Sequence, residues 1–372
     1  MAGAAEVFAR DYAQARAGFL AAAAARGLKV DSALHPSCKG AGGEDLAMDS
    51  LLLGPADAAS LLIVTSGTHG VEGFCGSGCQ RALLADIDLL KRIDAARVAV
   101  LLVHAVNPHG FSHLRRANED NIDMNRNFRD FSQPRPKSAD NTGYEELHAL
   151  LLPAEWPATA ANTGALLAAR ERMGHRRFQA AVSSGQATHP DGLFYSGAAP
   201  CWSNRTLRAL VKRHGAGRRH VGWIDIHTGL GPSGHGEKIF AGRNDAADLA
   251  RTRAWYGADV ASYYDGSSAS AEVTGTAVLC VHEECPGSQV AAMGLEYGTL
   301  PFDAVLQALR GAHWLEIHAD APAALREDIN RRIRDAFYVD TELWKGMILG
   351  QSRVAILQAV TALAQAQWSE GK

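Results

Sequence analysis

Short apolar runs rich in β-branched residues alternate with stretches of helical periodicity, and this alternation limits the possible folds more than any other feature of the sequence. The intervening segments 77–93, 163–182 and 204–214 carry apolar residues at the three- and four-residue spacing of helices. Strands that alternate with helices favour a layered α/β fold around a largely parallel sheet. The predicted strands are 50–54, 61–67, 97–108, 220–229, 237–242, 276–283 and 290–298.

Three further regions flank or interrupt this alternation. An alanine-rich segment with charges at helical spacing predicts an amphipathic N-terminal helix over 5–26. Residues 129–200 contain several prolines and polar stretches, so we expect an insertion with two or three helices and a long loop over 183–197. From 302 to 368 the pattern is almost wholly helical.

Charge and cysteine content exclude several classes of function. The formal net charge is −3, and Lys and Arg are scattered, so nucleic acid is not an expected partner. Charged residues interrupt the N-terminal alanines, and no stretch is expected to span a membrane. Six cysteines in a chain of 372 residues do not form a dense disulfide framework. We therefore expect a cytoplasmic protein without a membrane partner, in which Cys75 and Cys79 pack in the core rather than bind a metal.

Polar side chains gather where the predicted strands end. His69 and Glu72 follow the strand at 61–67 in the stretch SGTHGVEGF, and a segment rich in Arg and Asn follows 97–108. His227 lies at the end of 220–229 and Glu296 at the end of 290–298. Because ligands bind at the carboxyl ends of parallel strands in open α/β sheets, these side chains are expected to meet.

His69, Glu72 and His227 form a plausible ligand set for a catalytic metal ion. Catalytic zinc usually has three protein ligands drawn from His and carboxylate, with a fourth position left open. His69 alone would more simply be a structural residue, but the glycines around His69 and Glu72 allow a sharp turn that aims both at one point. Asp225, two residues before His227, is expected to orient that ligand.

The remaining polar residues supply the other parts of a hydrolase. A base is needed to take a proton from water, and Glu296 is the candidate, with Glu283 and Glu284 as rivals. Arg116 is expected to stabilise an oxyanion, whereas Arg115 is expected at the surface. Asn125 and Arg126 offer hydrogen-bond donors suited to a substrate carboxylate.

The ordered set GTHGVEG, NPHGF…RRANEDNIDMNRNF, DIHTG and LEYGT resembles the zinc carboxypeptidase superfamily known as M14, and most closely its bacterial branch of the DUF2817 type. It is also similar to the succinylglutamate desuccinylase and aspartoacylase branch. These motifs span 66–298. The resemblance implies one zinc-hydrolase domain over 1–372, with an α/β/α fold around a mixed, mostly parallel twisted sheet of about eight strands.

The resemblance also assigns roles by position. It implies that His69, Glu72 and His227 bind one zinc ion, that Glu296 is the general base, and that Arg116 polarises the scissile carbonyl. It places Asn125 and Arg126 on the binders of a substrate carboxylate. Digestive carboxypeptidases also have a substrate-contacting Tyr between the third ligand and the base, and Tyr256, Tyr263 and Tyr264 all lie in that interval.

The predicted function is therefore hydrolysis of an amide bond next to a carboxylate-bearing residue, as in a metallocarboxypeptidase. An N-acyl amino acid deacylase, which would take a small-molecule substrate, is the alternative within the same chemistry. A non-catalytic metal-containing binding protein is the alternative outside it, although the presence of Glu296 and both arginines argues against that possibility. The sequence leaves the oligomeric state open.

Overall fold

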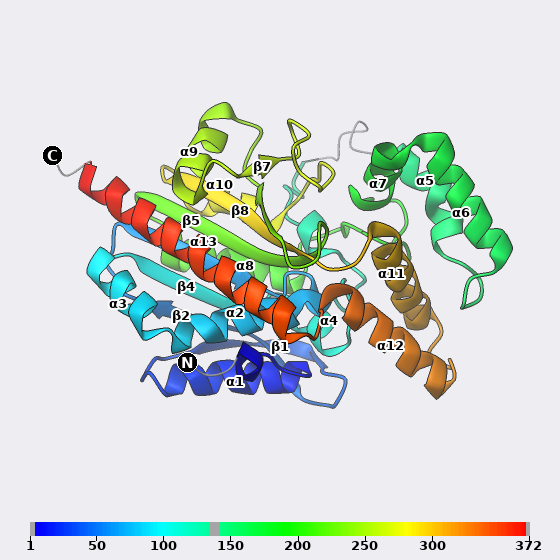
Figure 1. The fold of residues 1–372 in the computed structure, drawn as a ribbon, viewed down its shortest axis with the longest axis horizontal. Helices are drawn as coiled ribbons and strands as arrows, with labels where there is room; N and C mark the ends of the chain where they lie inside the picture. The colour runs from blue at the N-terminus through cyan, green and yellow to red at the C-terminus, as the bar shows by residue number, and fades with distance from the viewer. Residues whose placement is uncertain (1–3, 134–140, 370–372) are drawn as a thin grey trace.

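The computed structural model describes residues 4–133 and 141–369, and a mixed sheet runs through its centre (Figure 1). Eight strands lie in the order β1-β2-β4-β3-β5-β8-β6-β7. The strands are β1 (Asp31–Lys39), β2 (Asp45–Leu53), β3 (Ser60–Ser66), β4 (Ala99–His104), β5 (His220–Gly229), β6 (Gly236–Phe240), β7 (Ala261–Ser262) and β8 (Gln289–Gly298).

The four central strands run parallel to one another. β3 pairs in parallel with β4 and β5, and β5 pairs in parallel with β8. β2 and β6 flank this core in antiparallel pairing with β4 and β8, and β1 is antiparallel to β2. The predicted mixed α/β/α sheet is thus confirmed, and the carboxyl ends of β3, β5 and β8 meet at one edge.

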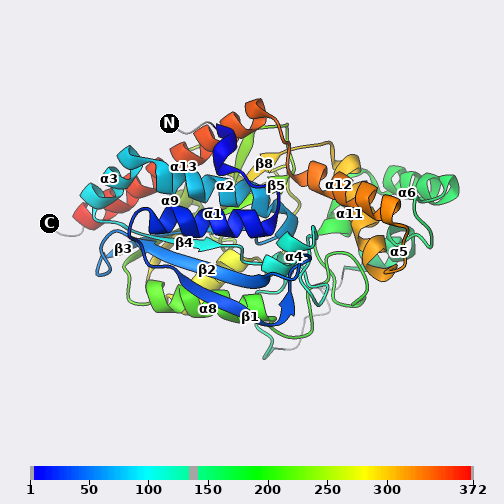
Figure 2. The ribbon, with the colours of Figure 1, turned by 90° about the horizontal axis from the view of Figure 1, so that it is seen from below.

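Helices cover both faces of the sheet. Figure 2 shows α1, α2, α3 and α13 on one face and α8 on the other. The helices on the first face are α1 (Tyr12–Ala24), α2 (Gly73–Ala85), α3 (Ile87–Ala96), α9 (Ala246–Tyr256) and α13 (Glu342–Ser369). The second face is covered by α8 (Trp202–Gly215), the 3-10 turn η5 (Ala277–Cys280) and α10 (Val281–Glu284). The short helix α4 (Pro108–Ser112) follows β4.

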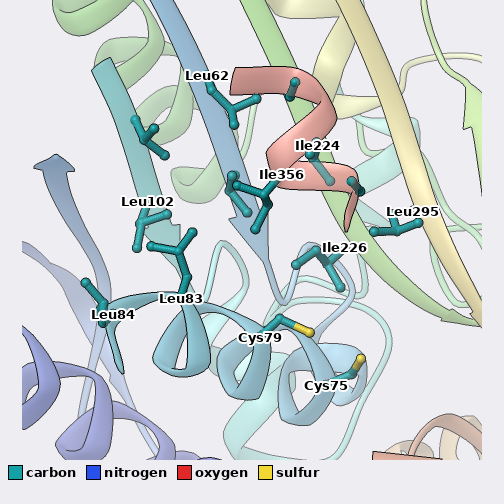
Figure 3. Close-up of a cluster of buried hydrophobic side chains, with 14 of the residues drawn as sticks. Leu62, Cys75, Cys79, Leu83, Leu84, Leu102, Ile224, Ile226, Leu295 and Ile356 are labelled. Carbon is teal, nitrogen blue, oxygen red and sulfur yellow. The ribbon is translucent and has the colours of Figure 1, made fainter. Parts of the chain in front are cut away.

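The core on the first face explains the two cysteines near the glycine-rich turn. Figure 3 shows Cys75 and Cys79 on α2, packed beneath Leu102 of β4 and Ile226 of β5. Both thiols are fully buried among apolar side chains, and burial raises the pKa of Cys75 well above its usual value. They pack in the core, as expected.

One predicted strand does not form, and the edge strand β1 was not predicted. The run 276–283 forms η5 and α10 instead of a strand. Its buried residues Ala277, Val278, Cys280 and Val281 recur at helical spacing, which places one face on the sheet. β1 was not predicted, because this edge strand is partly exposed along its length and contains Pro36, and so lacks the apolar pattern of a buried strand.

The N-terminal helix is shorter than the predicted 5–26. A 3-10 turn, η1, covers Ala4–Val7, and α1 begins only at Tyr12. Asp11 sets this start because its extended backbone and its side chain, which accepts a hydrogen bond from the amide of Gln14 at 2.8 Å, form an N-cap.

Helices from two distant segments form a separate layer beside the sheet (Figure 1). Residues 129–200 contribute α5 (Thr142–Leu151), α6 (Ala160–Met173) and α7 (His175–Ser183), with 134–140 outside the described residues. The C-terminal region contributes α11 (Phe302–Ile317) and α12 (Ala323–Phe337). Leu147, Phe178, Leu309 and Ile333 lie in their shared apolar core.

The last helix corrects one expectation. Within α13, Glu342–Gln367 is long and apolar enough to cross a membrane by length and composition alone, although no such stretch was expected. Its apolar side chains Ile348, Ile356, Val360 and Leu363 are buried in the cluster that covers the first face of the sheet. Packing against the sheet accounts for the apolar character of this helix.

Candidate metal centre and substrate cleft

The glycine-rich turn after β3 brings His69 and Glu72 to the edge of the sheet. Gly67 has a φ of +64°, which only glycine adopts readily, and the 3-10 turn η2 (Gly70–Glu72) follows. At Gly70 a Cβ atom would lie 2.0 Å from the carbonyl carbon of Gly110, so two backbones meet there without room for a side chain. The turn is therefore fixed by close backbone packing.

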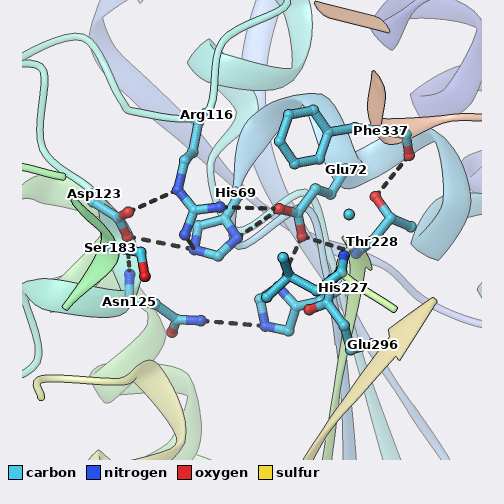
Figure 4. A network of polar contacts seen from close by, with 12 residues as sticks. His69, Glu72, Arg116, Asp123, Asn125, Ser183, His227, Thr228, Glu296 and Phe337 are labelled. Carbon is cyan, nitrogen blue, oxygen red and sulfur yellow. Dashed lines mark hydrogen bonds and ion pairs between the residues drawn. The ribbon is translucent and has the colours of Figure 1, made fainter. Parts of the chain in front are cut away.

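The pairing of β5 with β8 brings His227 beside Glu296. The two residues are register partners in the parallel ladder, at the carboxyl end of both strands. Because residues in register on adjacent strands point to the same face, both side chains enter the space in front of Glu72. Four predicted residues from three separate strand ends thus meet in one place (Figure 4).

Two imidazoles face the two oxygens of a single carboxylate. His69 Nδ1 lies 2.8 Å from Glu72 Oε1, and His227 Nδ1 lies 2.9 Å from Glu72 Oε2. The two rings are 4.8 Å apart between centroids. Burial opposes ionisation of Glu72, but the adjacent histidines outweigh it and hold the pKa of this carboxyl below its usual range.

A second carboxylate lies behind each imidazole. His227 Nε2 is 2.7 Å from Asp225 Oδ2, and His69 Nε2 is 3.4 Å from Asp123 Oδ1. Both aspartates are buried. In metal-bound histidines, the ring nitrogen that does not bind the metal commonly contacts such a carboxylate. The carboxylate fixes the orientation of the ring and raises the basicity of the nitrogen that binds the metal.

The charges around the site fit a divalent cation. The residues that line or contact the centre include four carboxyl groups, Glu72, Asp123, Asp225 and Glu296, but only two guanidinium groups, Arg116 and Arg126. When the imidazoles are neutral and the carboxyl groups are ionised, these residues carry four negative and two positive charges. Two further positive charges would make the group neutral. The donor types and the charge deficit together fit a divalent metal ion, and His69, Glu72 and His227 are placed so that they could hold it.

Arg116 lies directly beside this centre, whereas Arg115 does not. Arg116 Nε donates to Asp123 at 2.8 Å, and its Nη1 lies 3.3 Å from Glu72 Oε1. Its guanidinium also lies over the ring of Phe194, 5.0 Å from the centroid. Arg115 is buried, so the surface position expected for it was wrong, and it forms an ion pair with Glu316 at 2.9 Å. Of the two neighbours, Arg116 is therefore the one that contacts the centre.

Asn125 and Arg126 are positioned by a capped 3-10 turn, η3 (Met124–Arg126). Asp123 caps it by accepting from the amide of Asn125 at 2.9 Å. Arg126 donates to the carbonyls of Asn125 and Ser183, using one N–H on each of its nitrogens. Nη1 also lies 4.0 Å from Asp123 Oδ1, and each terminal nitrogen of this cleft-lining guanidinium retains a second N–H that no described hydrogen bond uses.

Glu296 has the environment of a base. Its Oε1 accepts from the amide of Leu230 at 2.9 Å, which fixes the carboxylate at the rim of the centre. Burial and the nearby charge of Glu72 raise the pKa of Glu296 to about 7. The rivals Glu283 and Glu284 lie on α10 and pair with Arg208 at 2.6 and 3.0 Å. They do not line the described cleft.

A cleft of about 1000 Å³, partly open to solvent, extends from the centre. Its walls are largely apolar and include Val182, Phe194, Ile239, Val278, Val305 and Leu306. Of the three tyrosines left open by the sequence, Tyr263 lines this cleft. Tyr256 is fully buried and donates to the carbonyl of Ala291, and Tyr264 donates to that of Gly242.

Sequence reasoning gave no role to two residues of the site. Asp123 lies inside the motif NIDMNRNF, so the sequence placed it near the site. Its contacts with His69 and Arg116 could be identified only from the fold. Phe194, which lies under Arg116 and within 6.0 Å of Arg126, comes from the loop after α7. An isolated Phe in a long loop carries no signal in a single sequence.

Residues 8–351 match the family described as "Protein of unknown function (DUF2817)", and the chain belongs to this family. No curated protein matches the sequence. The family assignment therefore carries no activity with it.

Among solved structures, the chain is similar to thrombin-activatable fibrinolysis inhibitor, with a TM-score of 0.52 and 10% identity over 96% of this chain and 77% of that one. This likeness shows the carboxypeptidase-like α/β fold. Carboxypeptidase A from Helicoverpa armigera has a TM-score of 0.44 and 12% identity, over 88% of this chain and 74% of that one. A metallo-carboxypeptidase from Pseudomonas aeruginosa has a TM-score of 0.40 and 15% identity, over 90% and 68%.

Proposed function

We propose that this protein is a zinc-dependent hydrolase that cleaves an amide bond next to a carboxylate-bearing residue, as a metallocarboxypeptidase does. The observation that carries the proposal is the convergence of His69, Glu72 and His227 in front of Glu296, in a cleft that also contains the partly buried Arg116 and the buried Arg126. A metal-binding protein without catalysis would have no use for a base with a raised pKa beside its ligands.

The three converging side chains would hold the ion through His69 Nδ1, His227 Nδ1 and the Glu72 carboxylate. When bound, zinc lowers the pKa of a water molecule towards about 7 and polarises a carbonyl group. Asp123 and Asp225 keep the two imidazoles turned with Nδ1 towards Glu72.

Glu296 would take a proton from the attacking water and return it to the leaving amine. Its pKa of about 7 suits both steps, because a group that titrates near the working pH can accept and then donate a proton. The amide of Leu230 holds one oxygen of this carboxylate, which leaves the other available to face the cleft.

The two arginines would act on the substrate. Arg116 is held by Asp123 with its guanidinium next to the metal ligands, where it can stabilise negative charge that develops on a carbonyl oxygen. Arg126 has two uncommitted N–H groups that can bind a carboxylate in a forked arrangement. Asn125 lies next to it, on the side of His227.

The position of Tyr263 favours a peptide over a small N-acyl amino acid. Tyr263 lines the same cleft as Arg126. In the sequence it lies between the third metal ligand and the base, where carboxypeptidases of the family that this sequence resembles have a substrate-contacting Tyr. The apolar walls around it suit an uncharged side chain. Hydrolysis of an N-acyl amino acid remains the competing outcome of the test below.

The decisive assay compares two sets of substrates on zinc-loaded protein. N-blocked dipeptides should release their C-terminal amino acid, and the same dipeptides with a C-terminal amide should react much more slowly because Arg126 has no carboxylate to bind. N-acetyl and N-succinyl amino acids test the deacylase alternative by release of the free acid. Turnover of neither set by protein with a full zinc content would contradict the proposed function.

A further inference from the structure

A second group of metal-ligating side chains lies in the helical insertion, outside the cleft. His148 comes from α5, and His189 and Asp191 come from the loop after α7, with one ligand atom of each within 4.8 Å of the others. The two imidazoles are stacked with centroids 3.6 Å apart and planes inclined by 18°. His148 Nε2 lies 3.9 Å from Asp191 Oδ1. We call His148, His189 and Asp191 the insertion cluster.

Hydrogen bonds hold the loop in place around the insertion cluster. The side chain of Gln186 donates to the carbonyl of His189 at 2.7 Å and accepts from its amide at 2.8 Å. Asn121 donates to the carbonyls of Pro190 and Gly192, both at 2.9 Å. The backbone on both sides of Asp191 is thus held by Gln186 of the same loop and by Asn121 from another segment, which fixes the backbone that carries two of the three donor residues.

Glu145 adds a carboxylate behind the cluster. It lies one helical turn before His148 on α5, and its Oε2 is 2.8 Å from His189 Nε2. This contact orients the imidazole of His189 as carboxylates do at metal-bound histidines. His148 Nδ1 is buried and has no hydrogen-bond partner within the described part of the chain, so nothing polar in the protein anchors that side of the ring.

We propose that the insertion cluster binds a divalent transition-metal ion such as Zn²⁺, separate from the ion of the cleft. Two imidazoles and a carboxylate are donors of the kind that zinc prefers, whereas Ca²⁺ and Mg²⁺ prefer oxygen donors throughout. Among the described residues, the neighbouring carboxylate of Glu145 is already bonded to Thr188 and His189, so we assign the ion a role in fastening the fold.

The ion would join α5 to a loop that supports the cleft. The same loop continues to Phe194, which lies 5.0 Å from the guanidinium of Arg116. It begins next to Ser183, whose carbonyl accepts from Arg126. An ion bound at the insertion cluster therefore restrains the segment that positions both cleft arginines, although it does not contact substrate.

Zinc stoichiometry tests the proposal without any substrate. Metal-free full-length protein is titrated with ZnCl₂ by calorimetry, and the bound metal is counted by mass spectrometry after gel filtration. The wild type should bind two equivalents. His189→Asn should lose one equivalent, and His227→Asn should lose the other. His175→Asn, which alters an exposed histidine on α7 outside the cluster, is the matched control and should keep both.

Thermal unfolding supplies a second readout. Zinc should raise the Tm of His227→Asn through the insertion cluster, and this rise should disappear in the double variant His189→Asn/His227→Asn. If His189→Asn and His148→Asn bind as much zinc as the wild type, the proposal is wrong. If His227→Asn instead binds as much zinc as the wild type, the cleft site is contradicted, so the two failures are distinguishable.

Discussion

Asp225 accepts a hydrogen bond from Nε2 of His227 at 2.7 Å, although only one residue of β5 separates them. Alternate residues of a strand share a face, so both side chains point into the same buried space. The hydroxyls of Thr65 and Thr68 also donate to Asp225, at 2.6 and 2.8 Å, and keep its carboxylate still. The ring of His227 is consequently turned with Nδ1 towards Glu72.

Asp225→Asn should weaken zinc binding in the cleft. The amide keeps the shape of the side chain but no longer accepts as strongly from His227, and loss of such a contact typically costs roughly 10- to 100-fold in metal affinity. Competition with a chromophoric chelator measures the change. Asp94→Asn, on the exposed side of α3, is the control. Equal zinc affinity in Asp225→Asn and wild type would show that the contact has no such role.

Glu296→Gln should abolish most of the amide hydrolysis while leaving the metal bound. The amide cannot accept the proton from water, and loss of a general base lowers kcat by roughly 10²- to 10⁴-fold. Steady-state kinetics and metal analysis of the same preparation measure both effects. Glu283→Gln, at the exposed ion pair with Arg208, should retain wild-type kcat. If Glu296→Gln is as active as that control, the base lies elsewhere.

Arg126→Lys should raise KM for substrates with a free C-terminal carboxylate by roughly 10- to 100-fold, because an ammonium group cannot form the forked pair that a guanidinium forms. The charge is kept, which limits the damage to the buried network around Ser183. C-terminally amidated substrates provide the internal control and should lose little further activity. An equal loss on both kinds of substrate would indicate a structural defect.

His104 and His313 should each destabilise the folded protein as the pH falls from about 6.5 to about 4. Burial lowers the pKa of His104 to about 4, and that of His313 also to about 4. In this window the unfolded chain binds protons that the folded chain does not, so protonation favours unfolding, by about 3 kcal/mol for each such histidine at the acid end.

Urea unfolding of His104→Gln tests this dependence. The variant should be less stable at pH 7, because His104 stacks on Phe19 and bonds to Ser77, but its stability should change less between pH 6.5 and 4. His175→Gln, at an exposed position, should retain the wild-type slope. A slope in His104→Gln identical to the wild type would contradict the prediction.

Gly70→Ala should destabilise the protein by more than about 2 kcal/mol, because the new methyl group would meet the backbone of Gly110 and neither segment can move freely. Gly346→Ala is the matched control. Its Cβ would have nothing within 4 Å on the exposed face of α13, so it should stabilise the helix by up to about 1 kcal/mol. Chemical unfolding of both variants checks that the free energy of unfolding falls in Gly70→Ala and rises in Gly346→Ala.

The sequence predicted the central sheet well because buried parallel strands leave a strong signal. The run 220–229 became β5 at those bounds, and the strand ends after 61–67 and 290–298 met as expected. The run 276–283 was wrongly predicted as a strand. A short apolar run with β-branched residues has the same sequence pattern whether it forms a buried strand or a buried helical turn. Edge strand β1 was missed because neither of its faces is deeply buried.

Within the cleft, the candidate metal ligands and the candidate base could be predicted from the sequence. The residues that position them were harder to predict. His69, Glu72 and His227 stood out because such side chains rarely follow a buried strand without a role. The choice between Arg115 and Arg116, and among Tyr256, Tyr263 and Tyr264, depended on which side chain each backbone turn aims at the cleft. Neighbours in sequence differ in direction, and only the fold sets that direction.

The bond from Arg126 to the carbonyl of Ser183 also limits how this protein can be engineered. Ser183 ends α7, so one wall of the cleft and the anchor of its buried arginine come from the helical insertion. Excision of that region to obtain a smaller protein would leave a buried guanidinium without one of its two carbonyl acceptors. The insertion can therefore be redesigned on its outer surface, but it cannot be deleted as an independent module.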